Sequence, residues 1–205
     1  MTEKASKVKV LRRRGGLKLS VGSLVLLLCC TFLIVTATFL QFNITNITFT
    51  GGVYIFKLIP QVPVVLFIAG FLGRKYGLAS VVLYILAGLF FAPVFALGGG
   101  WQYVFEYGFG YILAYIPAVF FVGSILRSGY SARNLLHAAI VGVLTIHIIG
   151  VLYMLFLAGI KGEGWTFMSS WIAAQSGLKI VYDLIFSFLA LFIARYVRIL
   201  LWFYV

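Results

Sequence analysis

The sequence predicts an all-α integral membrane protein, a bundle of six transmembrane helices with the N- and C-termini both in the cytoplasm. Of its 205 residues, 63% are hydrophobic and only 10% are charged, and the mean hydropathy is +1.13. Soluble domains carry roughly a quarter charged residues, and a soluble fold of this length would have to leave much of this apolar surface in water. Lipid is the solvent in which such a composition is stable.

Six apolar segments are each long enough, or nearly so, to cross a hydrocarbon core with about 20 helical residues. They cover residues 19–41, 53–73, 77–95, 109–127, 135–159 and 169–193. The first is longer than the hydrophobic region of a signal peptide and has no small-residue cleavage site at its end, so we expect it to be retained. Residues 1–18 then form a basic cytoplasmic tail, and residues 19–205 form a single transmembrane domain.

The second segment is the least regular of the six. Pro60 and Pro63 interrupt its first half, because proline lacks an N–H group and restricts the residue before it. We therefore expect the helix to begin near Val62, after a structured loop that dips toward the membrane. The stretch from Gly73 to Gly77 predicts a tight turn between the second and third spans.

The basic residues predict the orientation and argue against nucleic-acid binding, despite a net charge of +12. With the N-terminus inside, the outer loops hold only Lys57 and Lys161, whereas thirteen bases lie in cytoplasmic segments. The thirteen are Lys4, Lys7, Lys9, Arg12, Arg13, Arg14, Lys18, Arg74, Lys75, Arg127, Arg133, Arg195 and Arg198. Short basic clusters between apolar runs are typical of topology signals and of contacts with lipid headgroups.

The predicted outer loops, about 42–60, 96–108 and 160–168, are rich in glycine and aromatic residues. Gly98, Gly99 and Gly100 precede Trp101, and a second Gly-Trp pair begins at Gly164. Glycine lets backbone approach closely, while aromatic rings supply apolar walls. Two interpretations stay open: a lid over an outward-facing pocket, or tryptophans that anchor at the membrane interface.

Polar side chains in the last span mark a candidate ligand site, because ionisable groups inside a bilayer are costly. Lys179 and Asp183 lie four residues apart and therefore on one helix face, which Gln175, Tyr182 and Ser187 extend into a polar stripe. The alternative is an ion pair that only stabilises packing, but Lys before Asp is the weaker order for such a pair. The stripe therefore favours a hydrophilic cavity.

Two ionisable residues lie in or beside other spans. His147 is in the middle of the fifth span, where a lone histidine is more often a hydrogen-bonding packing residue than a ligand. Glu106 lies at the outer mouth of the fourth span and is either solvated or part of a pocket entrance.

The fourth span has a face of small residues at Gly110, Ala114 and Ala118, which is suited to close contact between helices. Tyr111 and Tyr115 lie beside this face, from which they could present their hydroxyl groups inward. The alternative is an aromatic belt at the membrane interface, which fits Tyr111 better than Tyr115.

The chain lacks the signatures of common enzymes. It has no Gly-x-Ser-x-Gly, no His-Glu-x-x-His and no Gly-Lys-Ser/Thr phosphate loop. Its four acidic residues and two histidines offer few partners for a metal site or a general acid–base pair. We expect no catalytic residues, no cofactor and no metal, and any ATP hydrolysis would need another chain.

Residues 61–125 carry several motifs in a characteristic order. Val62-Pro63 precedes the second span, Tyr84 to Gly88 leads to Pro93-Val94-Phe95, and the Gly98–Gly100 run is followed by Gly110-Tyr111-Ile112-Leu113. This stretch resembles the BioY family, the biotin-specific substrate-binding (S) components of energy-coupling-factor (ECF) transporters. The resemblance implies a six-helix bundle in the plasma membrane whose pocket opens outward, capped by the loops after spans one and three. It also implies biotin as ligand, with a transmembrane coupling subunit and a pair of cytoplasmic ATPases as partners.

The resemblance suggests roles for the polar residues, since biotin offers an apolar thioether ring, a ureido group and a carboxylate. Asp183 would accept hydrogen bonds from the ureido N–H groups, and Lys179 would meet either the ureido carbonyl or the carboxylate. Tyr111 and the loop Gly98–Trp101 would close over the rings. Tyr182 and His147 are further candidate binding residues.

The chain departs from the family's pattern at three places. Many relatives open the last span with Pro-Gly-Asp and a lysine three residues later, where this chain has Ser176-Gly177-Leu178 and Val181. Either Asp183 and Lys179 replace that pair, or the ligand is held differently. Tyr107-Gly108-Phe109 replaces Gly-Pro-Thr, and residues 21–40 lack the alanine-xxx-alanine contact that S components often present.

Two other functions stay open beside biotin capture. One is an S component for a different small vitamin. The other is a membrane scaffold or assembly protein that transports nothing, in which the polar stripe would be a contact between subunits.

Overall fold

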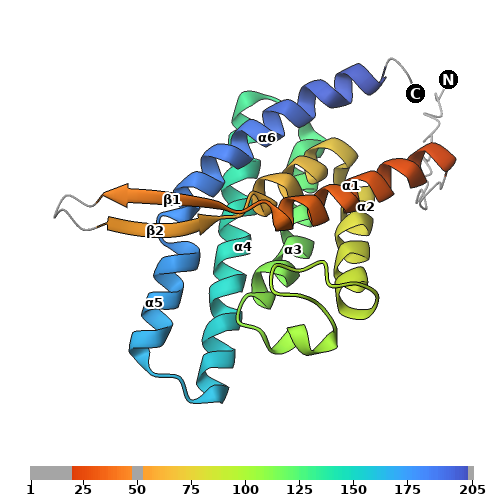
Figure 1. Cartoon of the computed structure of the whole chain (residues 1–205). Coiled ribbons are helices and arrows are strands. Elements are labelled where there is room, and N and C mark those ends of the chain that lie inside the picture. Colours follow the sequence, from red (N-terminus) through yellow and green to blue (C-terminus); the bar gives the residue numbers. More distant parts are fainter. Residues whose placement is uncertain (1–19, 48–52, 203–205) are drawn as a thin grey trace, which may run out of the picture.

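The computed structural model describes residues 20–47 and 53–202 and is almost entirely helical (Figure 1). Its helices are α1 (Val21–Phe39), α2 (Gln61–Phe90), α3 (Phe109–Ile125), α4 (Ala132–Lys161), α5 (Trp165–Ser176) and α6 (Lys179–Trp202). Two short 3₁₀ helices, η1 (Trp101–Phe105) and η2 (Leu126–Ser128), precede and follow α3. By length and composition, five helical segments of the described residues can cross a membrane, in agreement with the predicted all-α, multi-pass membrane protein.

α2 doubles back on itself at Gly73. Inside α2 this residue leaves the helical conformation, with φ 73° and ψ −179°, a region open to glycine because it has no Cβ. As a result, the side-chain Nε2 of Gln61 lies 2.7 Å from the hydroxyl of Tyr84. In a straight helix these two residues would be about 34 Å apart. The two halves, residues 61–72 and 74–90, are therefore antiparallel.

The predicted boundaries of the second and third segments need correction. Residues 53–58 lie in a β-hairpin, in which β1 (Phe42–Ile47) pairs antiparallel with β2 (Val53–Leu58). The helix begins at Gln61, close to the expected start, because Pro60 and Pro63 fit only at its first turn. The helix of the third segment ends at Phe90, before Pro93, rather than at residue 95.

The last predicted span, 169–193, is two helices rather than one. α5 ends at Ser176 and α6 begins at Lys179. A Cβ on Gly177 between them would overlap the carbonyl oxygen of Ala173, so this bend requires glycine. The break divides the predicted polar stripe and makes Lys179 the first residue of a helix.

The bundle buries polar side chains and exposes apolar ones. Ser80, Asp183 and Ser187 are fully buried. Large apolar side chains face outward on many helices, among them Leu24, Leu28, Phe32, Phe121, Leu152, Phe156 and Ile185. Lipid on the outside makes this arrangement stable, because polar groups in a membrane protein turn toward the bundle interior or a cavity.

α3 lies between α2 and α4 and packs against both. Its predicted small-residue face is confirmed, since Gly110, Ala114 and Ala118 are all buried. Tyr153 of α4 covers Gly110 so closely that an added Cβ would overlap the Cβ of that tyrosine. The missing side chain therefore sets the spacing of α3 and α4.

Replacing Gly110 with alanine should lower the free energy of unfolding by about 1–3 kcal/mol, because the new methyl group overpacks the α3–α4 contact. Thermal unfolding of the purified protein in detergent measures the change. Gly159→Ala on α4 is the matched control, since a Cβ there meets no atom within 4 Å. Equal unfolding midpoints for the two variants would contradict the close contact.

Candidate functional site

A cavity of about 490 Å³ lies where the start of α2, the start of α3 and the α5–α6 junction meet. We call it the aromatic cavity, and its lining consists of Gln41, Ile59, Gln61, Val62, Ala96, Leu97, Tyr103, Glu106, Tyr107, Gly108, Tyr111, Ile112, Tyr115, Trp171, Gln175 and Lys179. Small-molecule sites typically enclose about 300–1,000 Å³ and combine aromatic walls with a few polar groups. The aromatic cavity has both properties.

Gln61 anchors one wall of the aromatic cavity. Its amide Nε2 donates to the Oγ1 of Thr38 and to the hydroxyl of Tyr84, at 2.7 Å each. The hydroxyl of Tyr115 donates to the amide oxygen Oε1 at 2.9 Å. Both N–H groups and the carbonyl of the amide are thus used, and they join α1, both halves of α2 and α3.

Lys179 is the basic residue of the cavity lining. It is 8% exposed, and among the described residues it forms no ion pair. A buried ammonium group without an acidic partner is costly, so an anionic ligand at this position would be stabilised. The acidic residue of the lining is Glu106, whose side chain is exposed at the mouth.

Asp183 pairs with His147 instead of Lys179. Its Oδ2 lies 3.1 Å from the Nε2 of His147, and the other ring nitrogen, Nδ1, lies 2.8 Å from the Oγ of Ser176. The same Oγ lies 2.5 Å from the hydroxyl of Tyr111. A chain of hydrogen bonds therefore runs from Asp183 to the cavity wall, and the packing pair of Lys179 with Asp183 is not formed.

Asp183, at the buried end of this series of hydrogen bonds, keeps unused hydrogen-bonding capacity. Asp183 is fully buried, and its Oδ1 has no hydrogen-bond partner in the described part of the chain. The buried Oγ of Ser187, one turn later, also lacks one. Buried polar atoms without partners are uncommon and costly, so the hydrogen bond to His147 is the main compensation for burying this carboxylate.

The glycines before Trp101 hold their loop against the end of α2. Gly98 and Gly100 have φ angles of 121° and 93°, and the N–H of Gly100 donates to the carbonyl of Gly88 at 2.8 Å. A Cβ on Gly99 would lie 2.8 Å from that same carbonyl oxygen. This packing positions the neighbouring residues of the loop that line the cavity. Trp101 itself is 62% exposed.

The loop at the cavity mouth is tied to the α4–α5 connection. The hydroxyl of Tyr107 donates to the Oε1 of Glu163 at 2.8 Å. The Nζ of Lys161 lies 4.3 Å from the centre of the Tyr107 ring and donates to the carbonyl of Phe105 at 2.9 Å. Desolvation, together with the adjacent Glu163 carboxylate, raises the pKa of Tyr107, which keeps its hydroxyl protonated as the donor.

The structure brings part of the predicted site together. Lys179 and Tyr111 line the aromatic cavity, and Tyr111 and Tyr115 turn their hydroxyl groups inward. Seven other predicted residues are outside the lining: Asp183, His147, Tyr182, Gly98, Gly99, Gly100 and Trp101. For all nine predicted residues, contact with a ligand stays a prediction.

Gln61, Tyr103 and Trp171 are among the lining residues that the sequence reasoning did not name as site residues. Gln61 is a polar residue at the start of a proline-bounded helix, which was a usable signal. Tyr103 and Trp171 come from the loop before α3 and from α5, and their rings were indistinguishable in sequence from interfacial aromatic residues.

Replacing His147 with leucine should lower the free energy of unfolding by about 3–5 kcal/mol, because Asp183 is left buried without a partner. The double variant His147→Leu/Asp183→Leu should recover much of this loss, since it leaves no uncompensated charge. Thermal unfolding in detergent compares the variants. A double variant as unstable as His147→Leu alone would show that the ring stabilises the bundle by shape rather than by hydrogen bonding.

Comparison with known proteins agrees with this architecture. The model of the BioY family matches residues 7–201. A curated relative, "Probable biotin transporter BioY" of Lysinibacillus sphaericus, is 33% identical over 111 residues, which are 50% of this chain and 57% of the relative. The match thus spans little more than half of that relative's length. A solved structure, the S component for biotin from an ECF-type ABC transporter, superposes with a TM-score of 0.68 at 24% identity, covering 87% of this chain and 91% of that one. The solved structure shares the fold, and the family model extends over nearly the whole sequence, so this chain belongs to the BioY family.

Proposed function

We propose that this chain is the biotin-binding S component of an ECF-type transporter, which captures biotin outside the plasma membrane for ATP-driven import. The observation that carries the proposal is Lys179, a buried cation in the wall of an aromatic cavity that has no acidic partner among the described residues. A cavity of this kind suits a small ligand with an apolar body and one carboxylate.

Biotin matches the distribution of groups in the aromatic cavity. Its carboxylate would meet the Nζ of Lys179, and its thioether and ureido rings would lie against Tyr103, Tyr111 and Trp171. Gln175 is a cavity residue that offers both a donor and an acceptor for the ureido group. Asp183 supports this wall through His147, Ser176 and the Tyr111 hydroxyl.

Six membrane crossings with both termini in the cytoplasm are part of the proposal. The two antiparallel halves of α2 support two crossings, one for each half. The first half has twelve residues and a length of about 18 Å, less than the roughly 30 Å of a hydrocarbon core. Gln61 would then lie inside the membrane, which explains why each hydrogen-bonding group of its amide has a partner.

Energy for import would come from other chains. We propose a transmembrane coupling subunit and a pair of cytoplasmic ATPases as partners, which family membership supports. The cavity argues against a purely scaffolding role, because a scaffold has no need for a buried lysine in a cavity.

A different carboxylate-bearing vitamin is the second candidate ligand. Leu178 and Val181, which stand where many relatives carry an aspartate and a lysine, are 49% and 53% exposed and are absent from the cavity lining. The aspartate and the lysine of those relatives are therefore not reproduced at these two positions. This difference is the reason for a second candidate ligand.

Lys179→Met should weaken biotin binding at least tenfold, because the ligand's carboxylate loses its counter-charge. Biotin methyl ester, which lacks that charge, should bind the wild type more weakly and respond little to the substitution. Calorimetry on purified protein in detergent measures both ligands, with Lys75→Met as the control for loss of a distant positive charge. Equal losses for acid and ester would refute the assigned carboxylate contact.

Biotin should displace a radiolabelled biotin probe from the purified chain without ATP, and other small vitamins should not. Hydrogen bonds hold the side chains of Gln61 and Tyr111 in place in the cavity wall. A vitamin with a different ring system would therefore leave polar groups of the cavity unpaired. Absence of biotin binding, with binding of another vitamin in the panel, would replace biotin while keeping the transporter class.

A further inference from the structure

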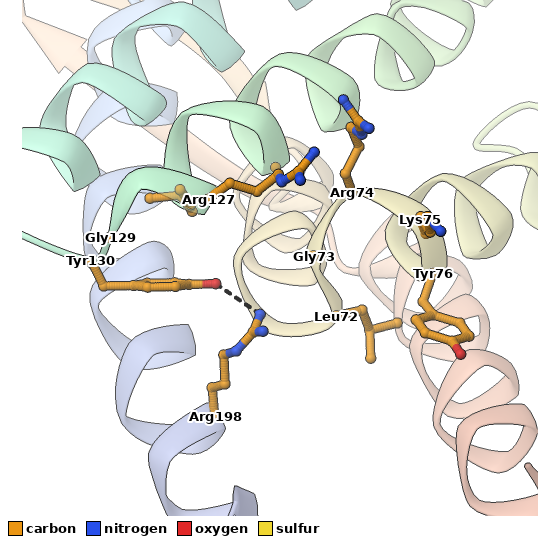
Figure 2. Close-up of a pocket in the computed structure, with 11 residues that line it drawn as sticks. Leu72, Gly73, Arg74, Lys75, Tyr76, Arg127, Gly129, Tyr130 and Arg198 are labelled. Carbon is orange, nitrogen blue, oxygen red and sulfur yellow. Dashed lines mark hydrogen bonds between the residues drawn. The ribbon is translucent and has the colours of Figure 1, made fainter. Parts of the chain in front are cut away.

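A second cavity, of about 560 Å³, lies at the other end of α3 (Figure 2). The aromatic cavity includes Tyr111 and Tyr115 near the start of α3, whereas this one includes Gly123 near its end. Its walls come from the reversal of α2, the α3–α4 connection and α6. The positive-inside rule assigns this end of the bundle to the cytoplasm.

Four basic residues line the second cavity, which we call the arginine cavity: Arg74, Lys75, Arg127 and Arg198. Of the residues that the structure describes, none of the acidic ones belongs to this lining. The chain has four acidic residues, and the three in the described part lie elsewhere. Glu106 lines the aromatic cavity, Glu163 accepts from Tyr107, and Asp183 pairs with His147. None of these three acidic residues forms an ion pair with Arg74, Arg127 or Arg198.

The guanidinium group of Arg198 is oriented by neighbouring residues. The Nη1 of Arg198 donates to the Tyr130 hydroxyl at 2.9 Å and to the carbonyl of Phe71 at 3.3 Å, which leaves its other nitrogens available. Tyr130 is held in turn by a 2.6 Å hydrogen bond to the carbonyl of Gly70. Figure 2 shows Arg198 and Arg127 reaching the cavity from opposite sides. Arg127 is exposed, and its side chain forms no hydrogen bond or ion pair with another described residue.

The backbone reversal adds to the positive potential. Gly73 ends the first half of α2, so Arg74 begins the second half inside the cavity lining. The N–H groups of a helix's first turn carry a partial positive charge and favour anions. α3 packs closely against this turn, because a Cβ added to Gly123 would lie only 2.7 Å from the Cα of Arg74.

If the four basic residues served only to orient the chain in the membrane, they would not need to surround one cavity. The positive-inside effect needs basic residues near the membrane surface, not side chains from three separate elements around one cavity. Arginine forks bind phosphate oxygens bidentately, and basic pockets between transmembrane helices on the cytoplasmic side bind anionic headgroups. We propose that the arginine cavity binds a phosphate group, supplied by an anionic phospholipid or by a soluble phosphate.

The test uses the full chain purified in detergent, with thermal unfolding and native mass spectrometry as readouts. Phosphatidylglycerol should raise the unfolding midpoint more than phosphatidylcholine, and Arg127→Gln should weaken its apparent affinity about fivefold. Arg127 is the safe variant for folding because no described residue depends on it for a hydrogen bond. Arg133→Gln, which removes an exposed arginine outside the cavity, is the matched control and should leave the affinity unchanged.

A parallel arm adds inorganic phosphate, compared with chloride at equal ionic strength. Stabilisation by phosphatidylglycerol alone identifies a lipid headgroup as the source, and stabilisation by phosphate in an Arg127-dependent way identifies a soluble one. The proposal is wrong if neither ligand exceeds its control, or if Arg127→Gln and Arg133→Gln have equal effects. Biotin affinity should be the same in both variants, which separates this test from that of the proposed function.

Discussion

The amide of Gln61 is the interaction on which the rest of the bundle depends. Its hydrogen bonds to Thr38, Tyr84 and Tyr115 join α1, the two halves of α2 and α3 at one buried point. In a membrane interior, no water is available to form hydrogen bonds with polar groups. A buried network of this kind is therefore very costly in free energy unless every donor and acceptor has a partner. Because this network is complete, it holds the start of α2 in place, and the aromatic cavity forms beside it.

The polar groups near the cavity divide into two classes. The Gln61 amide and the Tyr115 hydroxyl hold each other across the cavity wall, and His147 is held from both ring nitrogens. Lys179 forms no ion pair with a described residue and lines the cavity. This division is the expected design of a binding site, in which rigid surroundings position a small number of groups that remain available to the ligand.

Opposite ends of the bundle carry different chemistry. Among the described residues, the aromatic cavity has tyrosine and tryptophan walls with one base and one acid, whereas the arginine cavity has four bases and no acid. α3 connects the two, and its glycines permit contact with α4 at one end and with the reversal of α2 at the other. A substitution in α3 therefore has the potential to affect both cavities, although no described residue lines both of them.

The sequence by itself determined the membrane environment, the helical class, the basic end and the resemblance to BioY proteins. These follow from composition, from apolar segment length and from motifs, all of which are local along the chain. It also identified Lys179, Tyr111, Tyr115 and the small-residue face of α3, because helical periodicity places neighbours three or four residues apart.

Only the tertiary structure decided which polar groups meet. The partner of Asp183 is His147, 36 residues away, and the partners of Gln61 lie 23 and 54 residues away. The four-residue spacing that suggested a pair between Lys179 and Asp183 is a local rule, and the break at Gly177 places Lys179 at the first position of α6. Long-range hydrogen bonds depend on how whole helices pack, and no periodicity in the sequence encodes that packing directly.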